Sequence, residues 1–153
     1  MTWAENVKDI MDKFEHQKEA VTMCDFCEKS MYLIEADDEK MEFSVEIKIE
    51  KWMENPRGEL HGGVCATFFD TATGIAAIAA VRVKKENDIA DKNDVATVDL
   101  YTNYVARMPK DQTLIVTTRV LKNGRQFIRF ECEARSKESG KLIATCMANY
   151  VAL

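Results

Sequence analysis

The sequence is short of the features that mark nucleic-acid-binding, membrane and secreted proteins. Its formal net charge is −5, so there is no basic excess to neutralise the phosphates of a nucleic acid. The first residues are polar and of mixed charge, and they lack the apolar core of a signal peptide. Five cysteines are an odd number, which favours reduced cytoplasmic thiols over a disulfide framework. We therefore expect a cytoplasmic protein without a nucleic-acid or membrane partner.

Side chains that bind metals are also scarce. The chain has two histidines, and only Cys24 and Cys27 form a closely spaced cysteine pair. A structural zinc needs four ligands, and a thioredoxin-like redox site needs a βαβ pattern around its C-x-x-C. The sequence supplies neither. We interpret the pair as ordinary thiols and expect no metal and no other cofactor.

The N-terminal residues have helical periodicity. Trp3, Val7, Ile10, Met11 and Phe14 are the apolar positions, with charged residues between them. This spacing predicts an amphipathic helix over residues 2–21 that packs on the main body of the protein. The alternative is a mobile terminal arm, because chain ends are poorly ordered unless they are packed down.

From residue 31 onward most apolar residues alternate with polar ones, which indicates strands with one buried face. Six segments have this character, over residues 31–34, 41–49, 95–106, 113–121, 126–136 and 142–151. Asn123-Gly124 predicts a tight hairpin turn between the fourth and fifth of them. Strands that follow one another through short turns favour an antiparallel sheet.

The longest apolar stretch, residues 61–83, separates the second strand from the third. It approaches membrane-spanning length, but its threonines, its many alanines and Asp70 favour a helix buried in a soluble protein. Asp70 is the only charged residue between Glu59 and Arg82. We predict one α+β domain of 153 residues: a six-stranded antiparallel sheet wrapped around this helix, with a core over residues 31–153 and an extra N-terminal helix.

Small residues and Asp70 recur along one face of the predicted central helix. The sheet covers only one side of the helix, and small side chains on the other side let a second backbone approach closely. We therefore expect a second subunit to pack there. The positions concerned are Gly63, Ala66, Thr67, Asp70, Gly74 and Ala77.

The pattern N-x5-HGG-x6-D, formed by Asn55, His61, Gly62, Gly63 and Asp70, resembles the signature of hotdog-fold acyl-CoA thioesterases. The phenylacetate-degradation and 4-hydroxybenzoyl-CoA thioesterase-like branch is the most similar group, and the resemblance covers residues 45–152. It implies a hotdog fold, an acyl-CoA substrate, and catalytic sites shared across a homodimer. Tetramers built from two such dimers are also expected.

Thioester hydrolysis needs a donor for the developing oxyanion and a base or nucleophile for the carbonyl carbon. The Gly62 N–H at a helix N-terminus fits the first role, and Asp70 fits the second. Eight residues of helix separate them by about 12 Å, so one thioester would contact Gly62 of one subunit and Asp70 of the other. Asp70 alternatively serves only to fix the interface, and the glycines only to permit a tight turn.

Further roles follow from the resemblance. Asn55 is expected to contact the thioester end of the substrate, and Thr97 to hold the attacking water. His61 either faces the substrate or donates a hydrogen bond at the helix start. Asn55 has the alternative of a loop residue, and Thr97 that of an ordinary β-branched strand residue.

Contacts with CoA are expected from Gly63, Asp99, Tyr104, Lys122 and Arg125, with Arg107 as a further candidate. The Lys122–Arg125 hairpin tip is otherwise a solvated basic turn. Two other functional classes compete with a thioesterase: a hotdog module that binds or senses acyl-CoA without hydrolysing it, and a hotdog dehydratase. Release of thiol from acyl-CoAs separates the first of these from an enzyme.

Overall fold

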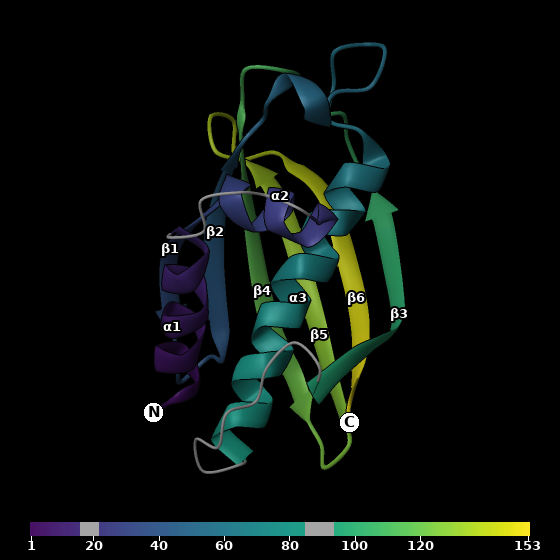
Figure 1. The fold of residues 1–153 in the computed structure, drawn as a ribbon. Coiled ribbons are helices and arrows are strands. Elements are labelled where there is room, and N and C mark those ends of the chain that lie inside the picture. The colour runs from purple at the N-terminus through teal and green to yellow at the C-terminus, as the bar shows by residue number, and fades with distance from the viewer. Residues whose placement is uncertain (16–21, 85–93) are drawn as a thin grey trace.

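The computed structural model describes residues 1–15, 22–84 and 94–153 of the chain. Six strands form one antiparallel sheet in the order β1-β2-β4-β5-β6-β3, as predicted (Figure 1). The elements are α1 (Trp3–Glu15), α2 (Met23–Ser30), β1 (Met31–Asp37), β2 (Glu42–Lys48), the 3-10 helix η1 (Lys51–Met53), α3 (Gly62–Lys84), β3 (Val95–Tyr104), β4 (Thr113–Asn123), β5 (Phe127–Ser136) and β6 (Leu142–Ala152).

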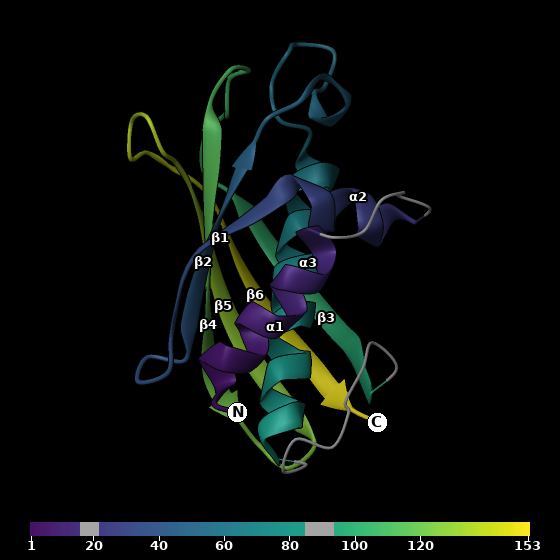
Figure 2. The ribbon, with the colours of Figure 1, turned by 60° about the vertical axis from the view of Figure 1, so that its left-hand side comes forward.

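The sheet curves around α3, and the two together enclose the core (Figures 1 and 2). Alternation along β2 turns Phe43, Val45 and Ile47 to the inner face of the sheet, where they are fully buried, and the Phe43 ring contacts Trp3 of the N-terminal helix. Phe68 and Phe69 of α3 are fully buried as well. The predicted central helix and wrapped sheet are therefore confirmed. The apolar composition of α3 is explained by its packing on the inner face of the sheet.

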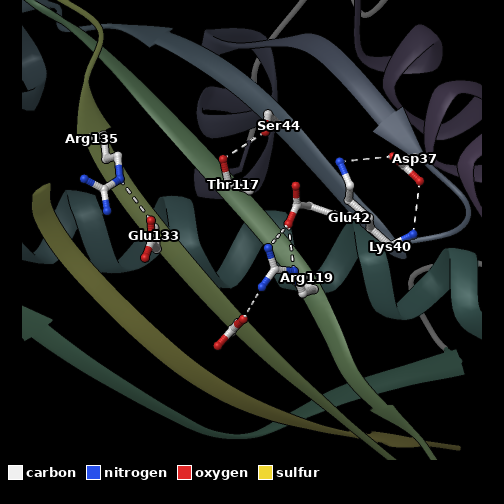
Figure 3. Close-up of polar contacts among 9 residues, drawn as sticks. Asp37, Lys40, Glu42, Ser44, Thr117, Arg119, Glu133 and Arg135 are labelled. Atoms are coloured by element: carbon white, nitrogen blue, oxygen red, sulfur yellow. Dashed lines mark hydrogen bonds and ion pairs between the residues drawn. The ribbon is translucent and has the colours of Figure 1, made fainter. Parts of the chain in front are cut away.

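The outer face of the sheet is polar. Arg119 on β4 contacts Glu42 on β2 and donates to Glu131 on β5 at 2.8 Å, and Ser44 bonds to Thr117 at 2.9 Å (Figure 3). One face packed on the core and one face solvated is the usual pattern of an antiparallel sheet. The inner face is the side that holds α3 and the candidate site.

Among the described residues, α3 alone is long and apolar enough to cross a membrane. However, 67% of its most apolar segment is buried inside the domain, as in the core helix of a water-soluble fold. Its remaining accessible stripe includes Gly63, which is exposed, and Ala66, Asp70 and Gly74, which are partly buried. Ala77, the last residue of the predicted subunit-facing stripe, is fully buried within its own chain, so that part of the prediction is wrong.

The N-terminal helix packs beside the C-terminal half of α3 (Figure 2). Trp3 Nε1 donates to the carbonyl of Ala76 at 3.2 Å, and Asp9 pairs with Arg82 at 2.8 Å. The predicted helix is thus confirmed over residues 3–15 as a packed element. Residues 16–21 of that prediction lie outside the described part of the chain.

A second short helix, α2, was not predicted. Thr22 begins it with a capping box: its hydroxyl accepts from the Asp25 N–H at 3.2 Å, and the Asp25 carboxylate accepts from the Thr22 N–H at 2.8 Å. The T-x-x-D sequence of this box is a known helix-start signal. The predicted Cys24–Cys27 pair lies on this helix, and Cys27 is buried.

Candidate active site

The candidate site residues fall into two groups along the exposed side of α3. One group surrounds the first turn of the helix, where Gly62 and Gly63 lie. The other surrounds Asp70, two turns further along. Because residues 62–84 form one continuous helix, the predicted separation of about 12 Å between Gly62 and Asp70 holds within one chain.

His61 caps the start of α3. Its carbonyl accepts the first helical hydrogen bond, from the Cys65 N–H at 3.0 Å, and its Nδ1 accepts from the Gly63 N–H at 3.0 Å. These are the two bonds of an N-cap residue. The helix-start role is therefore present, although the ring acts as an acceptor and not as the predicted donor.

The cap leaves the Gly62 N–H free. No acceptor for this N–H is present in residues 1–15, 22–84 and 94–153, while the neighbouring Gly63 N–H is occupied by His61. The first N–H groups of a helix point along its positive end. An unpaired donor with this orientation is what an oxyanion requires.

A cavity of about 190 Å³ opens beside Gly62. The predicted site residues Asn55, Gly62 and Tyr104 line it together with Cys65. Asn55 Oδ1 accepts from the Arg57 N–H at 2.9 Å and from the Glu59 N–H at 3.3 Å, so Asn55 shapes the loop that forms one wall. The loop role of Asn55 is therefore observed, on the rim of the cavity.

Tyr104 closes another side of this cavity. Its hydroxyl donates to the Gly62 carbonyl at 2.6 Å, and partial burial raises the pKa of its phenol. A Cβ atom on Gly62 would lie 3.2 Å from Tyr104 Cζ. Glycine at position 62 thus allows the ring to approach the helix start. Tyr104 in turn holds the carbonyl group of the residue whose N–H is the candidate oxyanion donor.

Two arginines flank Glu59 at the mouth of the cavity. Arg57 Nε donates to Glu59 at 3.1 Å, and an Arg107 nitrogen donates to the other carboxylate oxygen at 3.2 Å. The hydrogen bond from Arg57, with the nearby positive charge of Arg107, lowers the pKa of Glu59. A shallower groove of about 550 Å³ continues from this point past Arg107 and Lys141.

Three side chains meet at the middle of α3. Thr97 Oγ1 donates to Asp70 Oδ1 at 2.9 Å, and the Tyr150 hydroxyl donates to the same oxygen at 2.8 Å. The structure therefore brings two separately predicted site residues, Asp70 and Thr97, into contact and adds Tyr150, which sequence analysis missed. Tyr150 lies 80 residues from Asp70 in a strand whose pattern is that of an ordinary sheet, so no local signal marked it.

Three of the predicted CoA-binding residues lie away from both groups. Asp99 accepts from Asn149 Nδ2 at 2.8 Å on the outer face of the sheet, since the adjacent Tyr150 faces α3. Lys122 and Arg125 flank the β4–β5 hairpin tip, where Lys84 at the end of α3 contacts the Gly124 carbonyl. That end of the helix is roughly 30 Å from Gly62.

The cysteines near the site are poor nucleophiles. Burial raises the pKa of the Cys65 thiol to about 12 and that of Cys146 to about 11, so their thiolates are rare at neutral pH. In the described segments, no group of three or more His, Cys, Asp or Glu side chains is arranged to hold a metal ion. What the described residues of the site offer for chemistry is the unpaired Gly62 N–H and the Asp70 carboxylate.

Proteins of similar sequence occur in mouse and in a nematode. The chain is 28% identical over 112 residues to acyl-coenzyme A thioesterase 13 of Mus musculus, covering 73% of this chain and 72% of the mouse protein. It is 34% identical over 90 residues to the F42H10.6 protein of Caenorhabditis elegans, covering 59% of this chain. The match spans 48% of that relative, about half of its length.

Solved structures share the fold along nearly the whole chain. Zebrafish thioesterase superfamily member 2 has a TM-score of 0.76 at 22% identity, covering 100% of this chain and 99% of that one. The smu.793 protein of Streptococcus mutans, solved bound to acetyl CoA, has a TM-score of 0.69 at 16% identity, covering 90% and 96%. The family model of the thioesterase superfamily matches residues 57–143, from the loop before α3 into β6. The chain therefore belongs to the thioesterase superfamily and has the hotdog fold.

Proposed function

We propose that this protein is an acyl-CoA thioesterase that hydrolyses a thioester to a free acid and CoA. The proposal depends on one observation: the exposed side of α3 presents both an unpaired N–H, that of Gly62, and a carboxylate, that of Asp70. Homology to a mammalian acyl-CoA thioesterase supports the reaction, and a structural neighbour bound to acetyl CoA supports the ligand class.

In the proposed reaction the thioester carbonyl oxygen accepts from the Gly62 N–H. Asp70 takes a proton from a water whose oxygen attacks the carbonyl carbon, or the carboxylate attacks that carbon itself. The C–S bond then breaks, and the sulfur leaves as the CoA thiol, protonated by Asp70 in the first route and by water in the second. In the second route a water then hydrolyses the anhydride formed between the acyl group and Asp70, which frees the acid and regenerates the carboxylate. In this proposal Thr97, whose hydroxyl bonds to Asp70, helps to hold the attacking water. The amide donor stabilises the oxyanion by several kcal/mol, and the general base activates the water. These two kinds of catalysis are sufficient for this step.

A homodimer completes the site in this proposal. The separation of about 12 Å within one chain prevents one carbonyl from contacting both groups, so Asp70 comes from the partner subunit. The partly exposed stripe of Gly63, Ala66, Asp70 and Gly74 gives the second helix room. Among the described strands β3 is an edge strand with Val98 and Tyr101 exposed, a second surface suited to pairing with a copy of itself.

The cavity beside Gly62 is the proposed position of the thioester end of the substrate, next to Asn55 and Gly63. The adjoining groove passes Arg107 and Lys141, whose charges complement the phosphates of CoA. Lys122 and Arg125 lie too far from Gly62 of their own chain to bind the same CoA molecule there. We propose a cytoplasmic enzyme without a metal or other cofactor, and tetramers as pairs of these dimers.

Mixed dimers test the shared site. One chain carries Gly62→Pro, the other Asp70→Asn, and each variant alone is expected to lose at least about two orders of magnitude in turnover. After subunit exchange, a heterodimer contains one intact site and one doubly defective site. Counting sites in a two-fold dimer, each heterodimer recovers about half of the wild-type activity.

Thiol release from a panel of acyl-CoAs is the readout, with exchange followed by mass spectrometry. Mixing two preparations of the same variant is the matched control and restores nothing. If heterodimers form without recovery, the shared site is wrong. If the wild-type protein binds acyl-CoAs but releases no thiol, the binding or sensing module is the better description.

A further inference from the structure

Tyr150 connects the last strand of the sheet to the middle of α3. Its hydroxyl lies 2.8 Å from Asp70 Oδ1 and 2.8 Å from the Asp70 carbonyl oxygen. The buried hydroxyl of Thr73 lies 3.1 Å away on the third side. The phenol therefore sits between the main chain and the side chain of the same aspartate, and holds the carboxylate in one orientation.

The two oxygens of Asp70 differ in their surroundings. Oδ1 accepts from both Thr97 and Tyr150, whereas no hydrogen bond to Oδ2 occurs among the described residues. Asp70 as a whole is only partly buried. One oxygen is thus tied to the fold, and the other is left for a reacting group on the open side of α3.

We propose that Tyr150 is a positioning residue that fixes Asp70 through Oδ1 and so presents Oδ2 to the water or to the thioester carbon. The inference rests on the proposed function, because it assigns Tyr150 no chemistry apart from Asp70. Thr97 reaches the same oxygen from β3, so two neighbouring strands define the carboxylate orientation. Correct orientation of a reacting group is itself a large part of catalysis.

The surroundings of Tyr150 suit a permanent donor. Its ring packs edge-on against Phe130 with centroids 5.7 Å apart and an interplanar angle of 90°, which fixes the direction of the hydroxyl. Burial raises the pKa of the phenol above its usual range. The hydroxyl therefore keeps its proton at neutral pH, and it shares that one proton between the carboxylate and the carbonyl oxygen of Asp70.

A double-mutant cycle with Asp70→Asn tests this role. Tyr150→Phe keeps the ring and its packing and removes only the hydroxyl. We expect kcat to fall about 10- to 100-fold, the range for losing a hydrogen bond to a charged group, with KM within about 3-fold of wild type. In the Asp70→Asn background the same substitution should cause almost no further loss, since the group it positions is already inactive.

Tyr32→Phe is the matched control, because Tyr32 is an exposed tyrosine on the opposite edge of the sheet. Thermal unfolding and oligomeric state are recorded for every variant. A wild-type kcat in Tyr150→Phe, or an equal fold-loss in both backgrounds, overturns the proposal, because a merely structural role acts independently of Asp70. Wild-type turnover in Asp70→Asn instead refutes the proposed function, and the inference with it.

A measurement on the unaltered side chain covers the case in which Tyr150→Phe fails to fold. A buried phenol that donates to a carboxylate gives a slowly exchanging hydroxyl proton, visible by NMR at low field. We expect this resonance in the wild-type protein and expect it to move in Asp70→Asn. A Tyr150 hydroxyl proton that is unaffected by Asp70→Asn overturns the proposal.

Discussion

Replacing Gly62 by alanine and by proline separates the contribution of its N–H from that of its missing side chain. Both substitutions add a Cβ atom, which would lie 3.2 Å from Tyr104 Cζ. Only proline also removes the N–H. Gly62 is not among the residues with positive φ, so neither substitution is strained by the left-handed region. Proline is favoured at the first residue of a helix, and the residue before it is favoured in an extended conformation, as at an N-cap.

Both variants should require a shift of Tyr104, and only one of them should lose the oxyanion donor. The Tyr104 ring must shift by a few tenths of an ångström in both, and it is free to do so because the side chain is 55% exposed. The N–H is lost only in the proline variant. Losing one preorganised oxyanion donor costs about 10² to 10³ in kcat, or about 2.7–4 kcal/mol. We therefore expect Gly62→Ala to keep turnover within about 10-fold of wild type and Gly62→Pro to fall far below it.

The assay is thiol release from one acyl-CoA at saturating concentration, with kcat compared between the two variants. Circular dichroism and sedimentation confirm that both are folded and in the wild-type oligomeric state. Equal kcat values in folded Gly62→Ala and Gly62→Pro would refute the assignment of the Gly62 N–H as the oxyanion donor. A large loss in both would instead assign the effect to displacement of Tyr104.

Two further predictions concern the loop and cap around Gly62. His61→Ala should lower the free energy of unfolding by about 1 kcal/mol because the helix loses its N-cap, and His61→Asn should restore it. Urea unfolding measures both variants. An unchanged midpoint in His61→Ala would contradict the capping role of His61. Arg57 and Arg107 lower the pKa of Glu59 in the folded protein. The ionised Glu59 therefore stabilises the fold above the ordinary glutamate pKa of about 4.3, and this stabilisation is lost as the pH falls through the lower pKa of the folded state. The melting temperature should therefore drop more steeply on acidification below about pH 5 in wild type than in Glu59→Gln, and parallel curves would refute this.

Most of the fold could be predicted because its signals are periodic and long. A 23-residue apolar helix and strands with one buried face leave few ways to form a core. The helix α2 was missed since its eight residues are too short for a clear period. The β4–β5 hairpin was predicted, but its connection is residues 124–126 and not a two-residue turn. There the Gly124 N–H bonds to the Phe127 carbonyl at 2.9 Å.

The site was predictable only where its residues share one segment. Gly62 and Asp70 lie on one helix, so their order and separation follow from helix geometry alone. Tyr150 reaches Asp70 through the pairing of β3 with β6 and the curvature of the sheet over α3. Sequence periodicity contains neither of these. Thr97 was selected from a family resemblance, as the residue that holds the attacking water, and its bond to Asp70 Oδ1 was not predicted.

The register of β3 explains why Thr97 and Asp99 have different surroundings although they are two residues apart. In a regular strand they would face the same side of the sheet. Here Thr97 pairs with Tyr150 and Asp99 pairs with Asn149, with an irregularity between them. One additional residue in a strand moves every following side chain to the opposite face. Thr97 therefore contacts Asp70 on the inner face, while Asp99 bonds to Asn149 on the outer face. A β-bulge leaves no reliable mark in a single sequence, so the strand could be predicted while the face of Asp99 could not.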